Sequence, residues 1–157
     1  MRKRQIFLTT ESTRPPEQAW LELDRIASVE VTSEEQDYPV ESALVEDDGR
    51  GWRAANSGTQ IVRLVFDEPQ RLRRIWLAFE DTDHTRTQEF VLRWSPGIGH
   101  SFREIVRQQW NFSQPDSVRE IEDYAVELSD VVVLDLIIVP DKGNSEARAS
   151  LQGLRLA

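Results

Sequence analysis

The sequence predicts an all-β fold, a single-domain jelly-roll β-sandwich of about eight strands with little helix. From residue 60 onward, apolar residues alternate with polar ones, which is the two-residue period of a β-strand. Short segments rich in Pro, Gly, Asp and Asn separate these stretches and indicate turns. No stretch of ten or more residues shows convincing helical periodicity, and a length of 157 residues suits one domain.

The first 60 residues carry the weaker pattern. Residues 1–19 contain two consecutive prolines and are expected to form an arm, either flexible or added as an edge strand. The sandwich domain is then expected to span residues 20–157. Apolar residues alternate within 20–32, and residues 39–44 can form one helical turn.

The remaining strands follow at short intervals. They are predicted at 60–66, 73–79, 88–94, 102–110, 119–128, 131–139 and 148–156. Residues 67–70 include Pro69 and are predicted to form a turn. The run 131–139 is almost entirely apolar, which is typical of a central strand covered on both faces.

Composition excludes several classes of protein. The formal net charge of −9 argues against a broad nucleic-acid-binding surface, because Lys and Arg supply most of the affinity for phosphates. The chain has no cysteine, so disulfides and thiolate chemistry are excluded. Neither a signal-peptide core nor a membrane-spanning apolar run is found, which predicts a soluble, cytoplasmic protein.

The usual catalytic signatures are missing. The sequence contains no HExxH, GxSxG, P-loop or GxGxxG motif, and it has only two histidines. Its 28 acidic residues can produce pairs of carboxylates by chance, so such pairs do not indicate a glycosidase. We therefore expect a binding module rather than an enzyme.

Aromatic residues near one predicted loop are candidates for ligand contact. Trp110 and Phe112 lie where a strand is expected to meet the loop 111–116. An exposed aromatic ring can stack on a sugar or anchor a protein partner. The alternative is that both rings pack beneath their own loop.

A second loop offers hydrogen-bonding groups. His84 follows Asp83 and precedes Arg86 in the polar segment 80–86. Such side chains can bond sugar hydroxyls or a carboxylate. The alternative is a solvated acidic loop with no ligand.

The acidic turn 46–49 is a candidate cation site. Asp47 and Asp48 could supply carboxylate ligands, although their spacing does not match an EF-hand. The alternative is an ordinary turn in which Gly49 adopts a positive φ.

Three segments carry a resemblance to a known family. Residues 38–52 place an alanine before the acidic turn and a tryptophan after it, and a strand opening with Gln60 follows. Residues 90–97 end a strand in serine before a turn, and residues 149–156 form a closing strand. In this order they resemble discoidin-type (coagulation-factor C-type) domains over residues 20–157.

The resemblance implies a galactose-binding-like jelly roll that binds sugars, lipid headgroups or proteins through loops at one end. Many relatives hold a structural calcium ion near the acidic turn, partly through a carboxylate of the closing strand. Gly153 stands at that position here, which weakens the expectation of calcium. The absence of the family's paired cysteines argues against its secreted, lipid-binding form.

The leading hypothesis is a non-catalytic carbohydrate-binding module that is calcium-independent or weakly calcium-dependent, with a structural calcium ion as its one candidate cofactor. Trp110 or Phe112 would stack on the sugar, while Asp83, His84 and Arg86 would bond its hydroxyls. The alternative is an intracellular protein-interaction or scaffold domain of the same fold.

Overall fold

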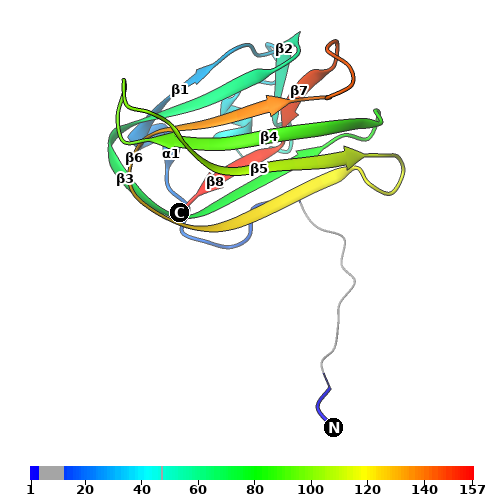
Figure 1. Ribbon diagram of the computed structural model, residues 1–157. Helices are drawn as coiled ribbons and strands as arrows, with labels where there is room; N and C mark the ends of the chain where they lie inside the picture. Colours follow the sequence, from blue (N-terminus) through cyan, green and yellow to red (C-terminus); the bar gives the residue numbers. More distant parts are fainter. Residues whose placement is uncertain (4–12, 47) are drawn as a thin grey trace.

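The computed structural model describes residues 1–3, 13–46 and 48–157, and these fold into a sandwich of antiparallel strands (Figure 1). Two one-turn helices are found among the described residues. In chain order the elements are α1 (Leu23–Ile26), β1 (Ala27–Val31), α2 (Glu41–Leu44), β2 (Trp52–Ser57), β3 (Gln60–Glu80), β4 (Arg86–Ser95), β5 (Arg103–Phe112), β6 (Arg119–Val139), β7 (Arg148–Leu151) and β8 (Gly153–Leu156). The all-β prediction, with one helical turn after residue 39, is confirmed.

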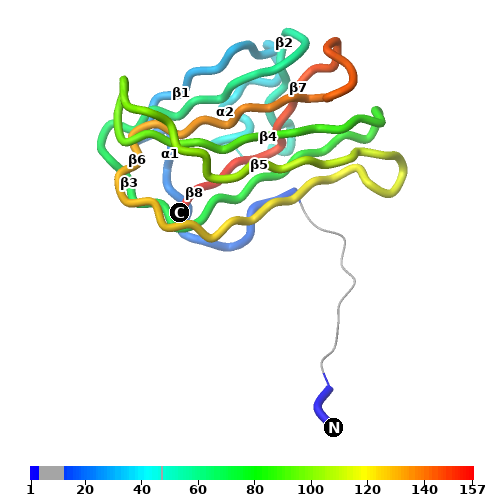
Figure 2. The backbone as a smooth tube through the Cα atoms, viewed as in Figure 1, coloured from blue at the N-terminus to red at the C-terminus, as the bar shows by residue number. Residues whose placement is uncertain are grey.

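The long strands β3 and β6 connect the two layers of the sandwich. Each has 21 residues, and the two pair with each other in both layers. In the first layer the strand order is β1, β3, β6, β4, β5. In the second layer the later part of β3 pairs with the start of β6 and with β8, and the separate β2–β7 pair completes the fold. Figure 2 shows how both long strands bend from one layer into the other.

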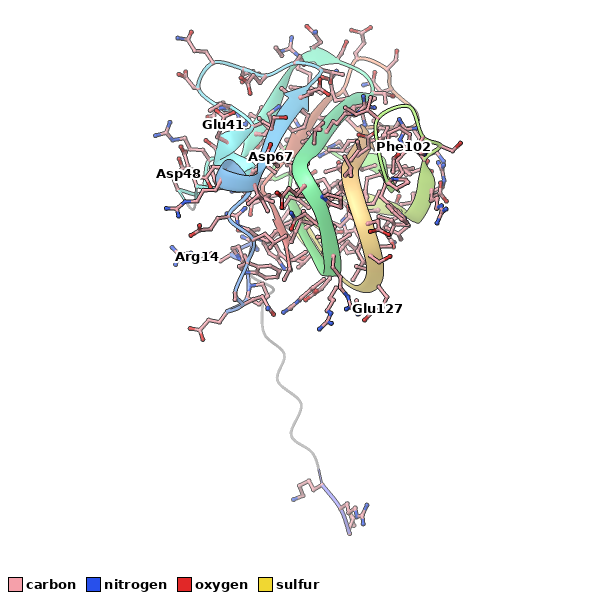
Figure 3. The ribbon with its side chains drawn as sticks, turned by 90° about the vertical axis from the view of Figure 1, so that its left-hand side faces the viewer. Arg14, Glu41, Asp48, Asp67, Phe102 and Glu127 are labelled. Carbon is pink, nitrogen blue, oxygen red and sulfur yellow. The ribbon has the colours of Figure 1, made fainter. Side chains whose placement is uncertain are left out.

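The predicted turn at 67–70 is wrong, because β3 continues through it. Hydrogen-bond pairing with β6 is irregular between Val65 and Leu72, so the strand bends there without reversing. Pro69 lacks a backbone N–H, and it is tolerated because it is exposed and opposes no residue of β6. Figure 3 labels Asp67, whose side chain lies in this bend.

Two further boundaries differ from the prediction. The predicted strands 119–128 and 131–139 are the two halves of β6, which bends between Leu128 and Val131. The predicted strand 148–156 is divided at Gln152 into β7, which pairs with β2, and β8, which pairs with β3. Alternation of side chains locates extended residues, but it does not show which neighbour each one pairs with.

The core lies between the two layers and is built by alternating side chains. Val62, Leu64 and Phe66 of β3 are buried, as their period-2 spacing predicts. Phe79 of β3 stacks on Phe90 of β4, with ring centroids 5.3 Å apart. Burying each large apolar side chain contributes roughly 1.5–3 kcal/mol, so the core holds both layers in fixed positions.

The N-terminal arm is described at residues 1–3 and from residue 13 onward. Trp20 donates its indole N–H to the carbonyl of Pro16, and Arg74 donates to the side chain of Gln18. These contacts hold residues 16–20 against β3. The rest of the predicted arm, residues 4–12, lies outside the described residues. No helix in the described part of the chain is long and apolar enough to cross a membrane.

Several turns meet at one end of the sandwich, on the right in Figure 1. They are the turns β3–β4, β5–β6 and β6–β7. Backbone hydrogen bonds connect them, for example from Asp81 to Val118, and from Lys142 to Thr87 at the start of β4. We call this the loop end.

Candidate functional site

A cleft of about 500 Å³ opens at the loop end. Residues of the β2–β7 pair line one side, where Arg53 lies directly across from Ser150. The other sides are lined by Glu35 and Tyr38, and by residues 80–84 after β3. Small-ligand sites usually enclose roughly 300–1,000 Å³ and contain a few convergent polar groups. The cleft therefore has the size and lining of a ligand site.

Arg53 and Tyr38 form a stacked pair in the cleft. Along β2, Trp52 and Ala54 are buried while Arg53 between them is exposed, so strand alternation directs Arg53 outward. Its guanidinium carbon lies 3.9 Å from the centroid of the Tyr38 ring. Among the described residues the Arg53 guanidinium has no carboxylate partner. Its N–H donors are therefore available to a ligand.

The backbone fixes the position of this stacked pair. The N–H of Arg53 donates to the carbonyl of Tyr38, and the N–H of Glu35 donates to the carbonyl of Arg53. Glu35 also faces Arg148, with 3.6 Å between the nearest nitrogen and oxygen. An exposed ion pair at this distance is weak. Both side chains can therefore exchange this contact for one to a ligand.

The opposite wall is organised by Asp81. Its carboxylate accepts the backbone N–H groups of Asp83 and His84 at 2.9 and 3.0 Å, and it lies 3.2 Å from Nδ1 of His84. On its other side Arg86 donates to it at 2.6 Å. Burial raises the pKa of Asp81, but the hydrogen bonds from Arg86 and the backbone outweigh this and hold the pKa below its usual value. Asp81 is thus an ionised anchor for the loop.

Gln114 ties the same loop to the β5–β6 turn. Its amide nitrogen donates to the carbonyls of Asp81 and His84 at 3.1 and 2.7 Å, and its amide oxygen accepts from the hydroxyl of Thr85. The loop that presents His84 is therefore held from two directions. Loops fixed in this way lose little entropy when a ligand binds.

Two of the predicted site residues line the cleft. Asp83 and His84 both face it and are exposed. Arg86 does not face it, because its side chain is only 4% exposed and donates to Asp81, Gln88 and the carbonyl of Pro140. Nε and Nη1 of Arg86 are thus bonded inside the protein, and the residue lines a neighbouring hollow instead of the cleft, so its contact with a ligand stays a prediction.

The two predicted aromatic residues do not form a stacking platform. Phe112 is 1% exposed, and the guanidinium of Arg86 covers its ring at 4.5 Å. Trp110 is half-buried and packs against the core, and its indole nitrogen is buried. Neither residue lines the cleft. The alternative, that these rings anchor their own loop, is the one that the geometry supports.

Among the cleft residues that the sequence did not predict are Glu35, Tyr38, Arg53 and Arg148. Arg53 carried a usable signal, because it is a charged residue between two apolar positions of a short strand. Glu35 and Arg148 lie far apart in the sequence and meet only through the β2–β7 pairing. No local pattern could have joined them.

The acidic turn was the predicted cation site. Asp47 lies outside the described residues. Asp48 is exposed at the edge of the molecule (Figure 3) and accepts the backbone N–H of Arg50 at 3.0 Å. Gly49 has a φ of 78°, as the ordinary-turn alternative predicts. No group of three or more acidic or histidine side chains in the described part of the chain could hold a metal.

An arginine instead lies at the carbonyls of this turn. Arg155 of β8 donates to the carbonyls of Ala43 and Glu46 at 2.7 and 3.0 Å, and Gln152 donates to the carbonyl of Gly49 at 2.6 Å. A guanidinium at these oxygens would repel a divalent cation. The described residues of the turn therefore do not fit the calcium site that the resemblance implies.

Comparisons with known proteins identify the fold. No family model and no curated protein matches the sequence. Among solved structures, a family 32 carbohydrate-binding module of C. perfringens NanJ in complex with galactose superposes with a TM-score of 0.63 at 12% identity, over 87% of this chain and 96% of that one. A pectin-binding module gives 0.61 at 17% identity, over 83% and 89% of the two chains.

A third structure is a Clostridium perfringens family 32 module in complex with GalNAc-β-1,3-galactose, with a TM-score of 0.61 at 16% identity over 88% and 99% of the chains. At such identities the likeness concerns the fold alone. The order of strands, the two layers and these superpositions together show that the chain has the discoidin-like, galactose-binding-like fold.

Proposed function

We propose that this protein is a non-catalytic glycan-binding module and that the ligand occupies the cleft at the loop end. The observation that carries the proposal is the exposed Arg53–Tyr38 stack in a 500 Å³ cleft, with free hydrogen-bonding groups around it. The three superposed modules bind galactose, pectin and GalNAc-β-1,3-galactose, which supports a saccharide as the ligand.

The cleft offers both kinds of partner that a sugar hydroxyl needs. Arg53 and Arg148 present N–H donors, whereas Glu35 and Asp83 present carboxylate acceptors. Hydrogen bonds to charged groups are shorter and stronger than neutral ones. In this account Tyr38 replaces Trp110 and Phe112 as the aromatic residue beside the ligand.

Two of the cleft carboxylates, Glu80 and Asp81, are poorly suited to catalysis. Glu80 forms an ion pair with Arg119 at 2.9 Å, and Asp81 is bonded to Arg86. A general acid must hold a proton near neutral pH, whereas the pKa of Asp81 is lowered. These contacts support binding without turnover.

The test is a glycan array on the full chain, followed by calorimetry on the glycans that bind. Arg53→Ala should weaken binding at least about tenfold, because it removes a charged donor that faces the ligand. Arg103→Ala is the matched control: Arg103 is also exposed and stacked on an aromatic ring, Trp94, but it lies outside the cleft. Arg103→Ala should bind like the wild type.

Absence of binding to every glycan would contradict the proposal and favour the protein-interaction alternative. Equal loss of affinity in both variants would also contradict it, because the effect would then not be local to the cleft.

A further inference from the structure

A second hollow lies beside the cleft. Its volume is about 390 Å³, and it lies between the turn after β3 and the loop that joins β6 to β7. It shares Asp81, His84 and Arg148 with the cleft. The two hollows therefore adjoin at these three residues. We call the second one the side hollow.

The side hollow has hydrogen-bonding groups of its own. Asn144 and Glu146 line it and are exposed. The amide oxygen of Asn144 accepts the backbone N–H of Glu146, which leaves the amide nitrogen directed elsewhere. Within the described residues, neither that nitrogen nor the Glu146 carboxylate has a hydrogen-bond partner. A donor and an acceptor are thus available on this side as well.

The loop that carries these groups is held in place. Asp141 accepts the backbone N–H of Gly143 at 3.1 Å, and the N–H of Lys142 donates to the carbonyl of Thr87 in β4. Lys142 also forms an ion pair with Glu89 at 3.0 Å. The side hollow is therefore bounded by two tied loops, one fixed by Gln114 and the other by β4.

His84 stands where the two hollows join. Its Nδ1 lies against Asp81, so the ring is oriented and Nε2 is left for other partners. Arg148 is the other residue at this junction that is exposed. A ligand that crosses from one hollow to the other would pass both side chains.

Resting on the proposed function, we propose that the cleft and the side hollow are two subsites of one groove. The ligand is then an oligosaccharide of at least two sugar units, with one unit in each hollow and the linkage beside His84 and Arg148. The first unit is bound by Arg53, Glu35 and Asp83, and the second by Asn144 and Glu146.

The experiment compares short and long ligands on the full chain by calorimetry. The probes are galactose against GalNAc-β-1,3-galactose, and galacturonic acid against its dimer. In at least one pair the longer member should bind about tenfold more tightly, since it gains the hydrogen bonds of the second subsite. The double variant Asn144→Ala with Glu146→Ala should reduce that gain to less than about twofold.

Glu127→Ala serves as the control, since Glu127 is an exposed acid of β6 next to its bend (Figure 3) and lines neither hollow. The Glu127→Ala variant should keep the full gain in affinity for the longer ligand. Equal affinity for the short and long members, or a gain that survives the double variant, would overturn the inference and leave the proposed function standing. If no member of either pair binds, the two-subsite inference is overturned, whereas the glycan-binding proposal falls only if the glycan array also shows no binding.

Discussion

Arg86 and Arg53 both lie over aromatic rings, but their surroundings are opposite. Arg86 covers Phe112 at 4.5 Å and is almost fully buried, with hydrogen bonds to Asp81, Gln88 and Pro140. Arg53 covers Tyr38 at 3.9 Å and is exposed, with no carboxylate partner among the described residues. An arginine over an aromatic ring thus stabilises the protein interior at Arg86, whereas at Arg53 it leaves N–H donors exposed for a ligand.

The difference follows from what each strand position faces. Arg86 begins β4 on the side that points between the layers, so its charge must be satisfied by the protein. Arg53 lies on the outer side of β2, where solvent or a ligand can satisfy it. An arginine–aromatic contact is therefore informative about function only together with its burial and its other partners.

Replacing Arg86 should have the largest effect on stability. Arg86→Met keeps most of the side-chain volume but leaves the Asp81 carboxylate, which is 10% exposed, without its cation. Breaking a buried ion pair on one side costs about 3–5 kcal/mol. Urea unfolding should show a loss of that order, whereas Arg53→Met should change the free energy of unfolding by less than about 0.5 kcal/mol. Similar losses of unfolding free energy in Arg86→Met and Arg53→Met would contradict the distinction between a buried, ion-paired arginine and an exposed one.

The hydrogen-bonded series Arg86, Gln88 and Glu120 should also make the stability of the protein depend on pH. Gln88 connects Arg86 to Glu120, which is fully buried. Burial, together with the neighbouring Glu122, raises the pKa of Glu120 from 4.5 to about 8. The folded protein therefore keeps a proton that the unfolded chain releases. The stabilisation is complete below pH 4.5 and is lost as the pH rises through 8.

Glu120→Gln removes this titration while keeping the side-chain size and an acceptor for Gln88. Between pH 6 and 8 the wild type should lose stability relative to this variant by about 1 kcal/mol per pH unit. Urea unfolding at several pH values measures the difference. Glu104→Gln, at an exposed position, serves as the control, and its free energy of unfolding should change with pH as that of the wild type does. If the free energies of unfolding of the wild type and of Glu120→Gln differ by a constant amount from pH 6 to 8, the raised pKa of Glu120 is ruled out.

The turn after α2 gives a smaller predicted effect. Arg155→Ala removes the guanidinium from the carbonyls of Ala43 and Glu46. It should cost about 2 kcal/mol, since the part-buried hydrogen bond to Ala43 contributes roughly 1.5–3 kcal/mol and the exposed one to Glu46 contributes little. We also propose that the fold needs no divalent cation. The melting temperature of the wild type should be the same in millimolar calcium chloride and in a chelator. A rise of several degrees with calcium would contradict that proposal.

The sequence predicted the fold well because its information is local and repeated. Alternating side chains such as Val62, Leu64 and Phe66 define strands wherever one face is buried. It missed the bends of β3 and β6, since a bend and a turn both show exposed polar residues such as Asp67 and Glu68. Which strands pair across the sandwich depends on contacts far apart in the chain.

The site was predicted less well for a related reason. His84 and Asp83 were predicted because they lie in one polar loop, and the structure places both beside the candidate cleft. Arg86 belongs to the same stretch, but the start of β4 turns it inward. Strand position, which the sequence locates only to within a few residues, decides between these outcomes.

The most direct test of the account is to map the bound glycan on the protein by NMR. In a titration of the ¹⁵N-labelled chain with a glycan that the array identifies, the largest shift changes should fall on Tyr38, Arg53, His84 and Arg148. The indole N–H of Trp110 should stay in place, because that group is buried outside the cleft. Changes centred on Trp110 and Phe112, with none at Arg53, would contradict the central claim.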